Sequence, residues 1–206
     1  MTDYFALLGE SRRPWIDPDE LKAKFLALTA QVHPDRVHNS TEAEKQAAGG
    51  RSAELNAAYN CLREPKTRLL HLLELERGTK PEEVREIPSD TMDAFTEISR
   101  LCREADLLLA EKAKATSPLL KVEHFQKGMA LAENLNLLLE KLNARREALT
   151  GQLKLLNLAW ESAPPAGSAT RRHVLPCSRL EHIYREFSFL TRWCHQLQER
   201  SLRLTF

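Results

Sequence analysis

The chain has 206 residues, of which 42% are hydrophobic and 29% are charged, and its formal net charge is +1. This length and apolar content are enough for one large or two small domains with real cores, and we expect two. The near balance of charge indicates neither a nucleic-acid-binding excess of lysine and arginine nor an acidic solvating tail. The partners are therefore expected to be proteins, with no nucleic acid.

The four cysteines contain no Cys-x-x-Cys pair, and the sequence shows no signal peptide or apolar run of membrane-spanning length. The pattern predicts free thiols in a reducing compartment, which favours a cytoplasmic protein with no membrane association. We interpret the cysteines as small buried side chains, so neither a metal site nor a cofactor is expected. The absence of a glycine-rich phosphate loop argues against nucleotide binding by this chain.

Three amphipathic helices are predicted in the first part of the chain, over residues 3–9, 17–32 and 41–63. Asp17 and Thr41 are the expected N-cap residues of the second and third helix. The apolar positions expected to face the core are Tyr4, Leu7, Leu8, Leu21, Phe25, Leu28, Val32, Ala43, Ala47, Ala48, Leu55, Ala58, Tyr59 and Leu62. Many are alanines, which predicts that the two long helices pack closely as an antiparallel hairpin with the short helix covering its open side.

Proline and glycine mark the next boundaries. Pro65 begins a leucine-rich helix that is expected to end near Gly78. The charged segment that follows contains two further prolines and reads as a linker. The predicted domains are therefore residues 1–76 and 90–206, joined by a linker at 77–89.

The second domain carries three helical patterns. They cover residues 90–115, 117–160 and 178–202. The middle pattern keeps close to heptad spacing from Leu119 to Leu156, and Gly151 is where a break is expected if there is one. A flexible loop with two prolines and a glycine is expected at about 161–177. Three such helices folded back on one another predict an all-α bundle.

Between two predicted helices lies the stretch Val32-His33-Pro34-Asp35-Arg36. Pro34 lacks a backbone N–H and moves the residue before it out of helical geometry, so His33 and Asp35 are displayed on a loop. With proline between them and no nucleophile nearby in sequence, the two make a poor catalytic pair, and we expect no catalytic residue and no enzyme. A metal site formed with His38 would be weak. A plain structural turn and a recognition loop are the interpretations left.

The order of these motifs resembles a J domain. The stretches that match are Asp3-Tyr4-Phe5, His33-Pro34-Asp35-Arg36, Leu55-Asn56-Ala57-Ala58-Tyr59-Asn60-Cys61-Leu62 and Pro65. Among J proteins the chain is similar to the HscB family, the co-chaperones of iron–sulfur cluster assembly, through its opening Asp-Tyr-Phe-x-Leu-Leu-Gly and the segment Arg68–Leu75. The resemblance implies an all-α protein with an N-terminal J-domain helical hairpin followed by a C-terminal three-helix bundle.

The resemblance also implies a function for the hairpin. A J domain docks on an Hsp70-type chaperone, here HscA-like, and stimulates its ATP hydrolysis. The residues implied in this contact are His33, Pro34, Asp35, Arg36, Lys22 and Lys24. Ala30 stands where the family often has arginine or lysine, which predicts docking that is weaker or tuned to a particular partner.

In the HscB family the bundle binds the IscU-like scaffold protein on which the cluster is built and brings it to the chaperone. The scaffold-binding residues implied here are Met92, Phe95, Ile98 and Phe189. Two alternatives stay open: these side chains are ordinary bundle core, or the bundle is an adaptor for another client. The heptad-like run also allows self-association of the chain as a homodimer.

Overall fold

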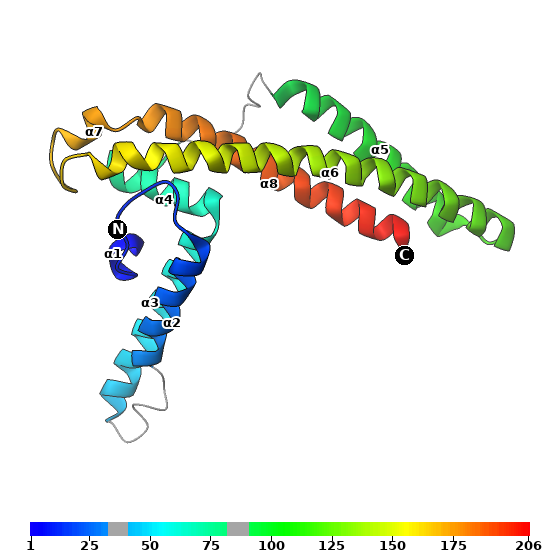
Figure 1. Ribbon diagram of the computed structural model, residues 1–206. Helices are drawn as coiled ribbons and strands as arrows, with labels where there is room; N and C mark the ends of the chain where they lie inside the picture. The colour runs from blue at the N-terminus through cyan, green and yellow to red at the C-terminus, as the bar shows by residue number, and fades with distance from the viewer. Residues whose placement is uncertain (33–40, 82–90) are drawn as a thin grey trace. The chain divides into compact units, whose positions relative to one another are not determined.

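The computed structural model describes residues 1–32, 41–81 and 91–206, and within these ranges the chain is built from α-helices without a β-strand (Figure 1). The helices are α1 (Tyr4–Leu7), α2 (Pro18–Gln31), α3 (Glu42–Arg63), α4 (Pro65–Arg77), α5 (Met92–Lys114), α6 (Pro118–Glu161), α7 (Arg171–Val174) and α8 (Cys177–Thr205). The predicted all-α fold is confirmed, and α6 runs unbroken through Gly151, the position where a break would have been expected if there were one.

The chain forms two compact units. The hairpin unit comprises Met1–Glu82 and Gly151–Tyr184, and the bundle unit comprises Glu83–Thr150 and Arg185–Phe206. The long helices α6 and α8 contribute to both, so each unit is described by itself. These units group residues that contact one another, whether or not they are close in the sequence. They therefore do not test the predicted division of the sequence at residues 77–89, which stays a prediction.

Local sequence explains where the hairpin helices begin. The carboxylate of Asp17 caps α2 by accepting hydrogen bonds from the backbone N–H groups of Asp19 and Glu20, and proline follows at the first helical position. At the start of α3, Thr41 and Glu44 form a capping box in which each side chain bonds the other residue's backbone N–H. Both predicted starts are confirmed.

Helices α2 and α3 lie side by side in Figure 1, but only part of their length is buried. The rings of Phe25 and Tyr59 stack with centroids 4.3 Å apart, and Leu55 is fully buried. Toward the start of α3, however, Ala43 and Ala47 are exposed. The prediction that alanines pack the two helices closely is wrong there, because among the described residues no side chain covers Ala43 or Ala47.

The short helix α1 docks through a face that includes Leu8, as predicted, but is centred on Phe5, which was not predicted. Phe5 and Leu8 are fully buried, whereas Tyr4 and Leu7 are only half-buried. The imidazole of His71 on α4 holds this turn in place: its ring stacks on Phe5, and its Nε2 accepts a hydrogen bond of 3.2 Å from the backbone N–H of Tyr4. The helix is a single turn, so its contacts with α3 and with His71 on α4 decide which side is buried.

Buried polar side chains join the hairpin unit's segments. Arg68 on α4 donates from Nε to the carbonyl oxygen of Pro14 at 2.9 Å and from Nη1 to that of Leu62 at 2.7 Å, and its burial lowers its pKa to about 10. Asn157 on α6 exchanges two hydrogen bonds of 2.9 Å with the backbone N–H and C=O of Trp15. Both contacts fix the irregular segment that leads into α2.

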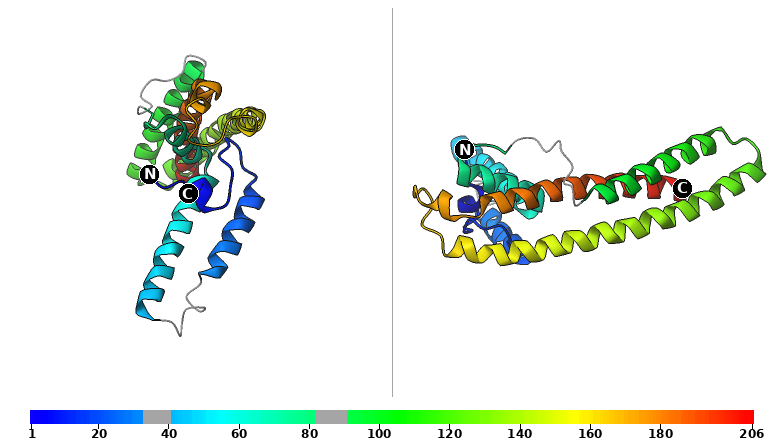
Figure 2. Two further views of the ribbon diagram at one scale, coloured as in Figure 1. Left: turned by 90° about the vertical axis from the view of Figure 1, so that its left-hand side faces the viewer. Right: turned by 90° about the horizontal axis from the view of Figure 1, so that it is seen from above.

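The bundle unit packs α5 and the second part of α8 beside α6, as the green, yellow-green and red ribbons of Figure 2 show. Its core side chains are Ile98, Leu101, Ala105, Leu108, Ala132, Leu135, Leu138, Leu139, Leu142, Leu149, Phe187, Phe189, Leu190, Trp193, Cys194, Leu197 and Leu204. Glu186 is completely buried in this core and is bound by both Nε and Nη2 of Arg145. In the described ranges no helix is long and apolar enough to cross a membrane.

Lowering the pH through about 6.5, the ordinary pKa of histidine, is expected to reduce the free energy of unfolding. Burial lowers the pKa of His71, so the unfolded chain takes up this proton at a higher pH than the folded protein does. Urea denaturation at about pH 7.5 and 5.5 measures the loss. His71→Gln should reduce it, and His195→Gln, at an exposed position, should not. An unchanged pH dependence in His71→Gln would contradict this assignment.

Candidate functional site

The predicted Hsp70-binding residues lie on and after α2. His33, Pro34, Asp35 and Arg36 fall outside the described residues, so the structure leaves their geometry open. His38 of the alternative metal site falls outside them as well. The described members of the set are therefore Lys22 and Lys24, both exposed on α2.

The two lysines differ in their surroundings. The ammonium of Lys24 donates to Glu10 Oε1 at 2.7 Å and to the carbonyl oxygen of Gly9 at 3.4 Å. Glu10 is buried and also binds Arg13 at 3.0 Å, so Lys24 belongs to a local charge network. Lys22 forms no ion pair within the described residues. Of the two, Lys22 offers its charge to an acidic partner without first breaking a bond.

The four residues predicted to bind the scaffold divide into two pairs. Met92 and Phe95, on the first turns of α5, expose 46% and 37% of their surface. Ile98 and Phe189 are 2% and 4% exposed and belong to the core of the bundle. Only Met92 and Phe95, which we call the α5 patch, are open to direct contact with another protein.

The structure does bring Phe95 and Phe189 together, through a residue that was not selected from the sequence. The buried ring of Trp193 lies 6.3 Å from the ring of Phe95 and 5.4 Å from that of Phe189, measured between centroids. Trp193 follows Phe189 by four residues, which places both on one face of α8, and that spacing was available in the sequence. Phe189 thus contacts Trp193 in the core, and Trp193 in turn contacts Phe95 of the α5 patch.

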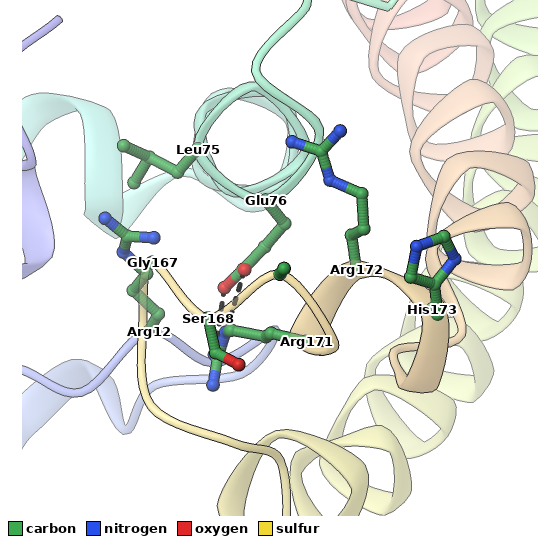
Figure 3. A pocket seen from close by; sticks show the side chains of 9 residues that line it. Arg12, Leu75, Glu76, Gly167, Ser168, Arg171, Arg172 and His173 are labelled. Atoms are coloured by element: carbon green, nitrogen blue, oxygen red, sulfur yellow. Dashed lines mark hydrogen bonds and ion pairs between the residues drawn. The ribbon is translucent and has the colours of Figure 1, made fainter.

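A second feature is a cavity of about 410 Å³ in the hairpin unit, shown in Figure 3. The buried guanidinium of Arg171 binds both carboxylate oxygens of Glu76, at 2.8 and 2.9 Å, and the carbonyl oxygen of Pro164 at 2.5 Å. Arg12 on the cavity wall pairs with Asp3 at 2.8 Å. The segment predicted only as a loop at 161–177 therefore contains the short helix α7, which this ion pair fastens to α4.

None of the observed clusters has the composition of a metal site: over the ranges that the structure describes, no group of three or more His, Cys, Asp or Glu side chains could hold an ion. The thiols are also unreactive in their surroundings. Burial raises the pKa of Cys61 to about 11 and raises the pKa of Cys102, Cys177 and Cys194. At neutral pH all four are therefore protonated and poor nucleophiles.

Substitutions should separate the α5 patch from the core beneath it. Ile98→Ala and Phe189→Ala are expected to lower the free energy of unfolding by about 2–4 kcal/mol, since each leaves a cavity in a closed core. Met92→Ala and Phe95→Ala should cost about 1 kcal/mol or less, because much of each side chain is already in water. Urea denaturation measures both. A loss for Phe95→Ala as large as that for Phe189→Ala would place Phe95 in the core.

With this geometry established, the chain can be compared with known proteins. No protein-family model matches the sequence. The structure is similar to the chaperone HscB from Vibrio cholerae, with a TM-score of 0.57 and 20% identity over 98% of this chain and 99% of that chain. It is also similar to the human co-chaperone protein HscB, with a TM-score of 0.59 and 21% identity over 98% of this chain and 81% of that chain. The predicted resemblance is thus confirmed at the level of the fold: the chain has the fold of the HscB co-chaperones.

Proposed function

We propose that this protein is a non-catalytic co-chaperone of the HscB type, which stimulates the ATPase of an Hsp70-type chaperone and delivers an iron–sulfur cluster scaffold protein to it. The observation that carries the proposal is the α2–α3 hairpin, whose two helices are joined by residues 33–40 with the sequence His33-Pro34-Asp35. The likeness in fold to the HscB proteins, which extends over both units, supports it.

Docking on the chaperone would use the α2 surface together with the residues that follow it. Lys22 supplies an exposed charge that forms no ion pair among the described residues, and Arg36 supplies another in the sequence beyond the helix. Charges of this kind accelerate association and fix orientation more than they add affinity. His33, Pro34 and Asp35 would then act on the chaperone's own ATP hydrolysis, so no catalytic group is required in this chain.

Scaffold binding would use the α5 patch. Met92 and Phe95 are partly exposed apolar side chains three residues apart on α5, and the ring of Phe95 rests on the buried ring of Trp193. An exposed aromatic side chain held on a rigid core can form the centre of an interface, because little conformational freedom is lost on binding. Ile98 and Phe189 would act by positioning this patch and not by touching the scaffold.

The ATPase assignment is tested in single-turnover hydrolysis by an HscA-like Hsp70. Asp35→Asn is expected to abolish stimulation. Lys22→Ala should raise the concentration needed for half-maximal stimulation by about threefold to tenfold at low salt, whereas Lys24→Ala should do less because Lys24 is already bound to Glu10. Equal stimulation by the wild type and Asp35→Asn would overturn the proposal. A larger effect of Lys24→Ala would overturn the assignment of the docking charge.

The delivery assignment is tested by calorimetric titration with an IscU-like scaffold. Phe95→Glu and Met92→Glu should each weaken binding by about tenfold or more, because a carboxylate would have to be desolvated in an apolar contact. The matched control is Leu107→Glu, at a position 67% exposed toward the other end of α5, which should leave affinity unchanged. If the control weakens binding equally, the α5 patch is not the contact.

A further inference from the structure

Two adjacent glycines lie inside α3, and their surroundings do not require glycine. Gly49 and Gly50 are helical, neither has a positive φ, and a Cβ added at either would enter open space. Gly128 on α6 differs, because a Cβ there would lie 3.0 Å from the carbonyl oxygen of Leu204. The glycine pair of α3 therefore weakens its helix without serving a turn or a close contact.

The turns of α3 that precede the glycine pair are almost entirely in water. Of residues 42–50, only Ala48 is partly covered by the rest of the described chain, and the others are exposed. Burial begins after the pair, where Ser52 is half-buried and Leu55 is fully buried. We call residues 41–50 the α3 start. Because helices in proteins gain most of their stability from packing of an apolar face, the α3 start gains little from the rest of the molecule.

Local contacts support the helical form of the α3 start. Thr41 and Glu44 form a capping box, and Lys45 pairs with Glu42 at 2.8 Å. Each contact of this kind stabilises a helix by a modest amount, and a helix this short is marginal in water when it is not packed. The α3 start is thus balanced between the capping box, which favours the helix, and the glycine pair, which opposes it.

Gly151 on α6 provides the contrast. It is also exposed and helical, and a Cβ added there would also enter open space. It lies, however, between Leu149 and Leu153, which are 1% and 0% exposed, so packing holds the helix on both sides of it. The glycine pair of α3 is held by packing on one side only, where burial resumes toward Leu55.

We infer that the α3 start is a local switch between helix and coil, which melts cooperatively up to the glycine pair while the remainder of α3 stays folded. Melting extends the connection between the packed parts of α2 and α3 from residues 33–40 to residues 33–50. The stretch His33-Pro34-Asp35 belongs to this connection, so melting lengthens the chain that carries it. The inference concerns the hairpin unit itself and does not depend on the proposed function.

Amide hydrogen exchange followed by NMR tests the switch in the whole chain. Amides of residues 46–51 should exchange at least about 100-fold faster than those of residues 55–62, which belong to the packed part of α3. Gly49→Ala combined with Gly50→Ala should slow exchange at 46–51 by about 20-fold, because each glycine weakens a helix about fivefold relative to alanine. Thr41→Ala should accelerate it by about fivefold, because a capping hydrogen bond is lost.

Limited proteolysis with trypsin gives an independent measurement. Lys45 lies within the α3 start, and a helix has to open before a protease can cleave it. Cleavage after Lys45, identified by mass spectrometry, should slow by about 20-fold in the variant with both alanines and accelerate by about fivefold in Thr41→Ala.

The matched control is Gly151→Ala, which makes the same change at an exposed glycine of a helix packed on both sides. It should leave exchange at residues 46–51 and cleavage after Lys45 as they are in the wild type. All the substituted positions are exposed, and circular dichroism melting checks that each variant is folded.

Three results would overturn the inference. They are exchange at residues 46–51 that is no faster than at 55–62, exchange at 46–51 that the two alanines leave unchanged, and an equal slowing by Gly151→Ala. The first would mean that α3 opens only when the whole hairpin unfolds, and the last would mean that the glycines act on overall stability.

Discussion

The hairpin unit depends on one buried guanidinium. Arg68 is the point where the segment before α2, the end of α3 and the start of α4 meet, because it donates to the carbonyl oxygens of Pro14 and Leu62 at once. A buried arginine without acceptors would be costly, so the three segments are held in the one arrangement that satisfies it. The direction in which α2 leaves this junction, and hence where the hairpin presents Lys22, follows from that contact.

Similar buried polar contacts occur where segments that are distant in the sequence pack against each other. Asn157 selects the backbone of Trp15, Arg171 selects Glu76, and Arg145 binds the fully buried Glu186. Apolar side chains can interdigitate in many registers, whereas each of these polar groups is satisfied only when particular acceptors or donors lie within hydrogen-bond distance. We therefore regard the leucine-rich surfaces as the main source of stability, and the polar contacts as the groups that specify which pairing forms.

The surfaces that we propose for binding are determined by which side chains the fold leaves exposed. On α2 the two exposed lysines differ because one of them, Lys24, is bound to Glu10. On α5 the apolar side chains of Met92 and Phe95 emerge from the core, while Ile98, one turn later, is closed within it. On α6 the apolar side chains of the first turns, among them Leu119 and Phe125, stay largely or partly exposed. In each case a side chain on a helical face stays exposed because no neighbouring helix or side chain among the described residues covers or binds it.

The sequence by itself determined the long helices and where most of them begin and end. Asp17 and Thr41 cap helices, and Pro65, Pro118 and Gly78 begin or end them. These are local interactions within one or two turns, so a linear pattern predicts them. It also identified the loop motif and the resemblance that carries the proposed function.

Tertiary structure alone decided which residues of each apolar helical pattern are buried in the core and which stay exposed. The docking of α1 through Phe5, the formation of α7, the burial of Ile98 and Phe189 and the exposure of Phe125 all depend on partners far away in the sequence. Helical periodicity says that a face is apolar. Whether that face is core or surface is determined by the other helices that pack against it, and their positions are non-local information that no single segment contains.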